Sequence, residues 1–144
     1  MLWTWDLKSA ATLLHREHQL LESHWQALHR AADHSAEMPL IHEGVVVQLM
    51  FMRGHFRSEE QFMREIEYPA YETHRAVHDV FINAVGKFLV DLPAFSKSWP
   101  ETVARLHAWI TRHNGEHDRE LSRFVTRLNC SAEGCRPETR KAFQ

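Results

Sequence analysis

Two pairs of potential metal ligands flank a single helix breaker near the middle of the chain. His55 and Glu59 form the first pair, His74 and His78 form the second, and each pair has i,i+4 spacing. On an α-helix, side chains four residues apart lie on the same face, so both members of a pair can point at one object. Imidazole and carboxylate groups in this arrangement are typical metal ligands.

The helix breaker between the pairs is the dipeptide Tyr68–Pro69. Proline lacks a backbone N–H and disfavours the helical conformation of the residue before it, so one helix ends here and another begins. The two helices are expected to run antiparallel. At about 1.5 Å per residue, both pairs then lie about 14 Å from the end of the hairpin. The spacing therefore brings the four side chains to the same level.

Apolar residues recur at helical steps in four long segments, which we expect to be helices: 9–32, 39–67, 69–90 and 98–128. Ser98, Pro100 and Glu101 form a capping-box pattern at the start of the last one. Short connections between long helices predict an all-α protein, an up-down-up-down antiparallel four-helix bundle. We expect an N-terminal arm with Trp3 and Trp5, a domain over 1–128, and a tail or linker over 129–144.

Composition excludes several classes of protein. The chain has 144 residues and a formal net charge of −2, which gives no reason to expect a nucleic acid or an anionic membrane as partner. No stretch approaches the roughly 20 apolar residues of a membrane span, and the N-terminus does not look like a secretory signal. Two cysteines, Cys130 and Cys135, are too few for a disulfide-built domain, so we expect free thiols and a cytoplasmic location.

The other two helices are expected to bring potential ligands to the same level as the two pairs. In antiparallel helices, residues equally far from the connecting loop lie opposite one another. Counted in this way from the other two loops, the positions opposite the two pairs fall close to His18 in one helix and within 113–118 in the other. Seven potential ligands, more than one zinc ion can use, then share one layer: His18, His55, Glu59, His74, His78, His113 and Asp118. They suit two six-coordinate ions that share bridging carboxylates, with iron or manganese favoured over calcium or magnesium.

One alternative concerns the last ligand. His113 and Asp118 are five residues apart, about 140° around a regular α-helix, so both face the site only if the helix unwinds locally. A single π-turn, tolerated by Gly115, would bring them together. His117 needs no such distortion, but we prefer Asp118 because the site needs a second bridging carboxylate. The other histidines, and Glu60 beside a ligand, are interpreted as surface, core or supporting groups: His15, His24, His29, His34, His42 and His107.

These motifs closely resemble those of bacterial hemerythrins. The pattern His-Phe-x-x-Glu-Glu-x-x-Met occupies 55–63, and Tyr-Pro-x-x-x-x-His-x-x-x-His-x-x-Phe occupies 68–81. Weaker matches are Glu-His-x-x-Leu at 17–21, Trp-x-x-x-His-x-x-x-x-Asp at 109–118, and a tryptophan in the N-terminal arm, Trp3. The resemblance extends over about residues 3–128. His15, Asn114-Gly115 and His117 depart from the family pattern.

The resemblance implies two iron ions joined by an oxo or hydroxo group. One iron would be held by His74, His78 and His113, the other by His18 and His55, with Glu59 and Asp118 bridging both. The iron with fewer imidazoles would leave an open position for O2. A dry apolar pocket beside it would be lined by Leu21, Trp25, Phe56, Phe81 and Trp109.

The resemblance implies reversible O2 binding for transport, storage or sensing. One alternative is an O2 or redox sensor cut from a larger signalling protein, because the sequence continues through 136–144 without an obvious end, and its partner would be an attached signalling domain. Another is a di-iron enzyme that handles peroxide, NO or iron, which the polar segment 114–117 would favour.

Overall fold

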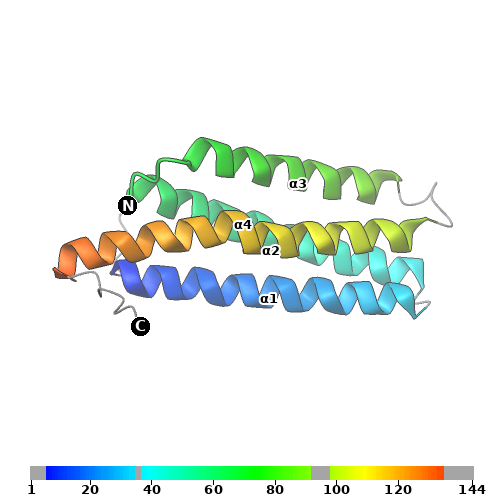
Figure 1. Ribbon diagram of the computed structural model, residues 1–144. Coiled ribbons are helices and arrows are strands. Elements are labelled where there is room, and N and C mark those ends of the chain that lie inside the picture. The colour runs from blue at the N-terminus through cyan, green and yellow to red at the C-terminus, as the bar shows by residue number, and fades with distance from the viewer. Residues whose placement is uncertain (1–5, 35–36, 92–97, 135–144) are drawn as a thin grey trace, which may run out of the picture.

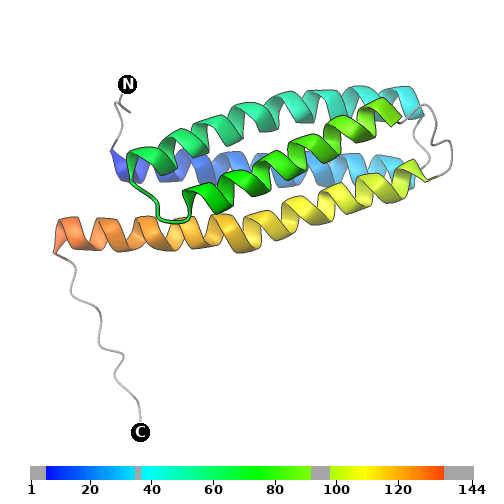
Figure 2. The same ribbon diagram turned by 90° about the horizontal axis from the view of Figure 1, so that it is seen from above.

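A computed structural model describes residues 6–34, 37–91 and 98–134 of the chain. These residues form four helices and no strand: α1 (Leu7–Asp33), α2 (Met38–Glu65), α3 (Tyr71–Asp91) and α4 (Trp99–Glu133). Consecutive helices run in opposite directions, and α1 packs against α2 and α4 (Figures 1 and 2). The predicted antiparallel four-helix bundle is confirmed. The predicted N-terminal arm with Trp3 and Trp5 lies outside the described residues.

The turn between α2 and α3 holds the two ligand pairs at the same level. Glu67 has a φ of 52°, in the left-handed region. Its N–H donates to the Arg64 carbonyl, and the Tyr68 N–H donates to the Met63 carbonyl. These two bonds form a Schellman motif, which satisfies carbonyl groups at the end of α2. The chain then passes through Pro69 and starts α3, close to the predicted breaker.

The other helix ends differ in part from the predictions. The Asp6 carboxylate caps α1 by accepting from the Ser9 N–H at 2.9 Å. The predicted capping box of α4 is wrong, because the Ser98 side chain makes no capping hydrogen bond, although α4 does begin after it. Helix α4 also continues five residues beyond the predicted 128 and ends at Gly134, whose φ is 68°. Because α4 continues through 129–133, the described part of the predicted tail is helical, while the domain boundary itself stays a prediction.

Two apolar clusters fill the bundle on either side of the ligand layer. Towards the α2–α3 turn lie Ala10, Leu14, Phe62, Met63, Tyr68, Leu121 and Val125. The larger cluster, towards the opposite end, includes Leu21, Trp25, Phe56, Phe81, Val85 and Ile110. The polar layer is therefore enclosed by hydrophobic side chains along the bundle axis. Among the described residues, no helix is both long and apolar enough to cross a membrane.

Candidate metal centre

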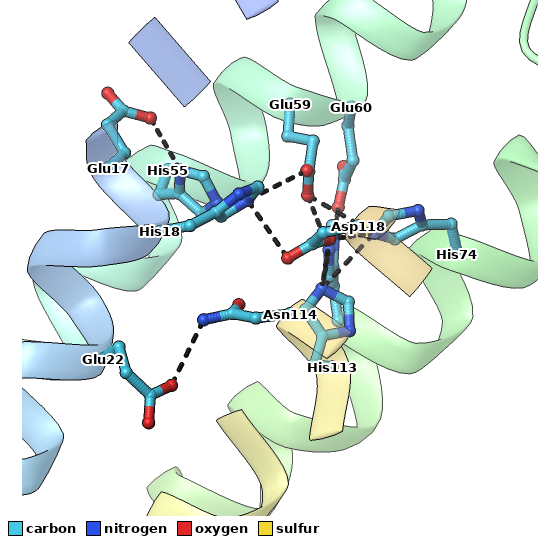
Figure 3. A network of polar contacts seen from close by, with 11 residues as sticks. Glu17, His18, Glu22, His55, Glu59, Glu60, His74, His113, Asn114 and Asp118 are labelled. Atoms are coloured by element: carbon cyan, nitrogen blue, oxygen red, sulfur yellow. Dashed lines mark hydrogen bonds and ion pairs between the residues drawn. The ribbon is translucent and has the colours of Figure 1, made fainter. Parts of the chain in front are cut away.

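The bundle brings all seven sequence-predicted ligands together, with α2, α3 and α4 giving two each and α1 giving one. Six of them are at most 6% exposed: His55, Glu59, His74, His78, His113 and Asp118. His18 on α1 is somewhat more open, with a side chain that is 14% exposed. Figure 3 shows side chains from all four helices converging on one region. Such a concentration of buried polar groups is costly unless they pair with one another or bind an ion.

Three imidazoles converge on one side of this region. The Nε2 atom of His113 lies 3.3 Å from that of His74 and 3.2 Å from that of His78. A neutral imidazole carries a hydrogen on only one ring nitrogen, so three converging Nε2 atoms cannot all satisfy one another. A cation at this point would accept a lone pair from each. Glu59 completes the group, with its Oε2 atom 3.1 Å from Nε2 of His78.

His18 and His55 form the other side, with ring centroids 4.6 Å apart. Glu59 and Asp118 lie between the two sides, and each carboxylate gives one oxygen to each side. Glu59 places Oε1 3.2 Å from Nε2 of His18, while its Oε2 lies on the three-imidazole side. Asp118 places Oδ2 3.1 Å from Nε2 of His18 and Oδ1 3.0 Å from Nε2 of His113. This is the arrangement expected of two carboxylates that bridge a pair of ions.

Unsatisfied polar atoms support a metal site here. Both carboxylate oxygens of Glu59 and of Asp118, and Nε2 of His18 and of His55, are buried and make no regular hydrogen bond among the described residues, although imidazole nitrogens lie 3.0–3.2 Å from the carboxylate oxygens. Each such atom costs about 1–3 kcal/mol if left unpaired. Ligand atoms of Glu59, His74, His78 and His113 lie within 4.8 Å of one another, as do those of His18, His55 and Glu59. The residues therefore fit two metal ions that share Glu59.

The contacts between imidazoles and carboxylates also shift the pKa values of the groups in the site. Burial alone would raise the pKa of Glu59, but the imidazoles of His18, His74 and His78 outweigh it and hold that pKa well below its usual value. Burial alone would lower the pKa of His74, but the Asp118 and Glu59 carboxylates raise it to about 9. Burial keeps the pKa of His113 below its usual value. Protons therefore balance the carboxylates when no metal is bound, and a metal must displace them.

Two further carboxylates hold ligand imidazoles from outside the layer. Glu17 lies 2.6 Å from Nδ1 of His55, and Glu60 lies 2.9 Å from Nδ1 of His78. Each fixes the tautomer in which Nδ1 carries the hydrogen and Nε2 faces the site. Glu60 was expected only as a general supporting or solvated group. Glu17 was missed, because its position next to His18 in the sequence does not reveal that it reaches a histidine on α2.

The α4 segment differs from the prediction in one respect. No π-turn is present, because α4 is a regular α-helix through His113 and Asp118, and Gly115 has no left-handed φ. Both side chains reach the site by leaning towards it from the two edges of the helix face. Asp118 has oxygens beside three imidazoles. His117 instead stacks beside His113, with ring centroids 5.5 Å apart.

The predicted pocket residues pack against the ligands. Phe56 stacks on His78 with centroids 3.8 Å apart, and Trp109 stacks on His113 at 4.9 Å. Phe81 stacks on Trp109, and Trp25 packs edge-on against Phe81. Leu21 belongs to the same apolar cluster. These side chains fix the imidazole planes and keep water from that end of the site. Their assignment as an O2 pocket stays a prediction.

A cavity of about 720 Å³ lies between α1 and α4, and its lining includes His18, Glu59 and Asp118. None of the five predicted pocket residues lines it. Its apolar walls include Leu14, Phe62, Leu121 and Val125. The remaining lining is polar and extends to exposed residues such as His15, Gln19 and Arg119. The site is therefore reached from solvent on its His18 side.

Comparison with known proteins agrees with this geometry. The chain is 26% identical over 130 residues to a bacteriohemerythrin of Stenotrophomonas maltophilia, covering 90% of this chain and 84% of that protein. It is 26% identical over 116 residues to a bacteriohemerythrin of Pseudomonas aeruginosa, covering 78% and 73%. No solved structure gives a significant match. Residues 9–125 match the family model of the hemerythrin HHE cation binding domain, and the chain therefore belongs to the hemerythrin family.

Proposed function

We propose that the layer holds two iron ions and binds O2 reversibly. Mixed imidazole and carboxylate ligands suit iron. The relatives that the chain resembles are named bacteriohemerythrins, which agrees with iron as the metal. The observation that carries the proposal is the position of the two carboxylates, because Glu59 and Asp118 each have one oxygen beside each set of imidazoles.

The two sets of imidazoles are unequal. His74, His78 and His113 would hold one ion, and His18 and His55 the other, so the second ion has one imidazole fewer. Bound ferrous ions would supply the electrons that hold O2. The cavity reaches the site at His18, so O2 enters on the side with fewer protein ligands.

Several side chains of this protein control the environment of the ligands. Phe56 and Trp109 cover the rings of His78 and His113 and exclude water from that side. Glu17 and Glu60 orient His55 and His78 from the far side of each ring. The sensor alternative depends on residues 136–144, which lie outside the described part of the chain. The described residues support O2 binding itself.

The test is reduction of the iron-loaded protein without oxygen, followed by exposure to O2 and measurement of the visible spectrum and the iron content of the same sample. We expect two irons per chain and a new absorption band that disappears under vacuum. A folded protein that takes up no iron would overturn the metal assignment. A band that stays under vacuum would overturn reversibility.

A further inference from the structure

A second polar group lies along the seam between α1 and α4, outside the predicted ligands. His29 and His107 face each other with their Nδ1 atoms 3.0 Å apart. The other ring nitrogen of His107, Nε2, lies 3.1 Å from Oε1 of Glu22. The other ring nitrogen of His29, Nε2, lies 3.5 Å from Oδ2 of Asp33. Four titratable side chains therefore form one continuous row, Asp33–His29–His107–Glu22, which we call the seam row.

Hydrogen-bond chemistry fixes the direction of this row. A carboxylate only accepts, so Nε2 of His107 must carry the hydrogen that Glu22 receives. In neutral His107, Nδ1 is then bare and must accept from the Nδ1–H of His29. A hydrogen can therefore pass from His29 to His107 as another passes from His107 to Glu22. Each step follows a contact of about 3 Å that is already made.

The two ends of the row lie in different environments. The Asp33 side chain is 57% exposed, and that of Glu22 at the other end is 35% exposed, while that of His107 between them is 17% exposed. Glu22 lines the same cavity as His18, Glu59 and Asp118. It is held there by Thr111, whose hydroxyl donates at 2.6 Å, and by Asn114, whose amide donates at 3.3 Å. Figure 3 shows Asn114 between Glu22 and the ligand group. The row therefore connects solvent to the cavity beside the site.

We propose that the seam row is a proton relay that serves the molecule held in the cavity. Starting from protonated His29, the Nδ1 hydrogen moves to Nδ1 of His107, and the Nε2 hydrogen of His107 moves to Oε1 of Glu22. Glu22, now a carboxylic acid, gives its proton to the bound molecule and becomes a carboxylate again. His29 takes a new proton from water at Nδ1. His107, whose side chain is 17% exposed, loses its Nδ1 hydrogen to water and takes one from water at Nε2, which restores its starting tautomer.

The consequence for O2 rests on the proposed function. Conversion of O2 to hydrogen peroxide consumes two electrons and two protons. Two bound ferrous ions would supply one electron each, and the seam row would supply the protons one at a time. The row would therefore raise the rate at which bound O2 is lost as hydrogen peroxide instead of leaving as O2.

The relay is tested first without any redox chemistry. The full chain is loaded with two equivalents of zinc, which is diamagnetic, and the ring nitrogens of His29 and His107 are followed by ¹⁵N NMR as pH changes. We expect His107 to carry its hydrogen on Nε2, and we expect the titration of His29 to shift in His107→Gln. His24→Gln is the matched control, because His24 lies on α1 but packs against Phe51 of α2. Independent titration of the two rings would overturn the relay.

The second measurement follows the decay of the visible band after O2 is added to the reduced iron protein. We expect Glu22→Gln and His107→Gln to slow this decay and the release of peroxide by at least roughly tenfold, with unchanged iron content. This is less than the factor of about 100 that a sole proton donor contributes, because the cavity also admits water. His24→Gln should decay like the unaltered chain.

The outcomes separate the two proposals. A band that forms but decays equally in all variants would overturn the relay and leave O2 binding intact. A protein that gives no band with O2 would overturn the proposed function, and with it the role of the row towards O2. A purely structural role of the row would change the melting temperature of the variants without changing the decay, and would also overturn the relay.

Discussion

Glu17 and Glu60 should each control the affinity of a different metal ion. Glu17 lies 2.6 Å from Nδ1 of His55, and Glu60 lies 2.9 Å from Nδ1 of His78. Their histidines belong to opposite sets of the layer. The informative substitutions are Glu17→Gln and Glu60→Gln, because glutamine keeps the shape and a hydrogen-bond acceptor but removes the charge.

The expected loss of metal affinity follows from the hydrogen bond that each substitution weakens. A hydrogen bond to a charged group contributes about 1.5–3 kcal/mol, and a neutral one about 0.5–1.5 kcal/mol. Replacing the carboxylate by an amide therefore costs about 1–1.5 kcal/mol, which is about tenfold in metal affinity. Supporting carboxylates of metal-bound histidines commonly contribute about 10–100-fold. The Glu17 and Glu60 side chains are 24% and 20% exposed. Because solvent screens their charge, we expect an effect near the lower end of this range, about tenfold in metal affinity.

The assay is competition for cobalt or zinc between the protein and a coloured chelator, which gives two binding constants for two sites. We expect each single variant to weaken one constant about tenfold and the double variant to weaken both. Glu43→Gln, an exposed carboxylate on α2, is the control and should change neither. If Glu17→Gln weakened both constants equally, or neither, the assignment of separate orienting roles would be refuted.

Three substitutions and a change of pH test the site and the fold. His55→Ala should leave at most one iron per chain, and Glu59→Ala fewer still because Glu59 contacts both sets of imidazoles; two full irons in either variant would contradict the ligand assignment. Glu67→Gly should raise the free energy of unfolding by about 0.5–1 kcal/mol and the melting temperature by about 2–4 °C, because Glu67 has a φ of 52°; a lower melting temperature would show that its side chain stabilises the turn. The pKa of His74 in the folded protein, about 9, exceeds the 6.5 of a free imidazole. Its stabilising contribution in metal-free protein, about 3 kcal/mol at most, is therefore complete below pH 6.5 and lost as pH rises to about 9. Urea unfolding should show this loss in the metal-free protein and not in the metal-loaded protein, whose ligand imidazoles have already lost the proton.

Local rules predicted the helices and the level of the ligands. The Tyr68–Pro69 dipeptide ends one helix and begins the next within two residues of the expected positions. Fixed rise per residue then places His55 and Glu59 opposite His74 and His78, because antiparallel helices joined by a short turn keep the same level on both sides. His18 and His113 lie at this level for the same reason, since the connections between the helices are short.

Features that depend on the approach of side chains from different helices were not predictable in this way. The sequence distance between His113 and Asp118 suggested a π-turn, but side chains can lean towards a common point without altering the helix. The end of α4 was placed too early because 129–133 are polar, and polarity marks an exposed helix as readily as a tail. His29 and His107 were interpreted as isolated groups, although they meet across two helices.

By itself, the sequence determined the helical hairpins, the layer in which the ligands lie and the family resemblance, because these depend on helical period, breakers and spacing within one segment. Only the tertiary structure decided which oxygen of Glu59 and Asp118 faces which imidazole, which outer carboxylates orient the ligands, and that the cavity opens between α1 and α4. The physical reason is that spacing along a helix fixes the height and azimuth of a side chain. The rotation of each helix about its axis, and hence the partner that a side chain meets, is set by the packing of the two apolar clusters around the polar layer.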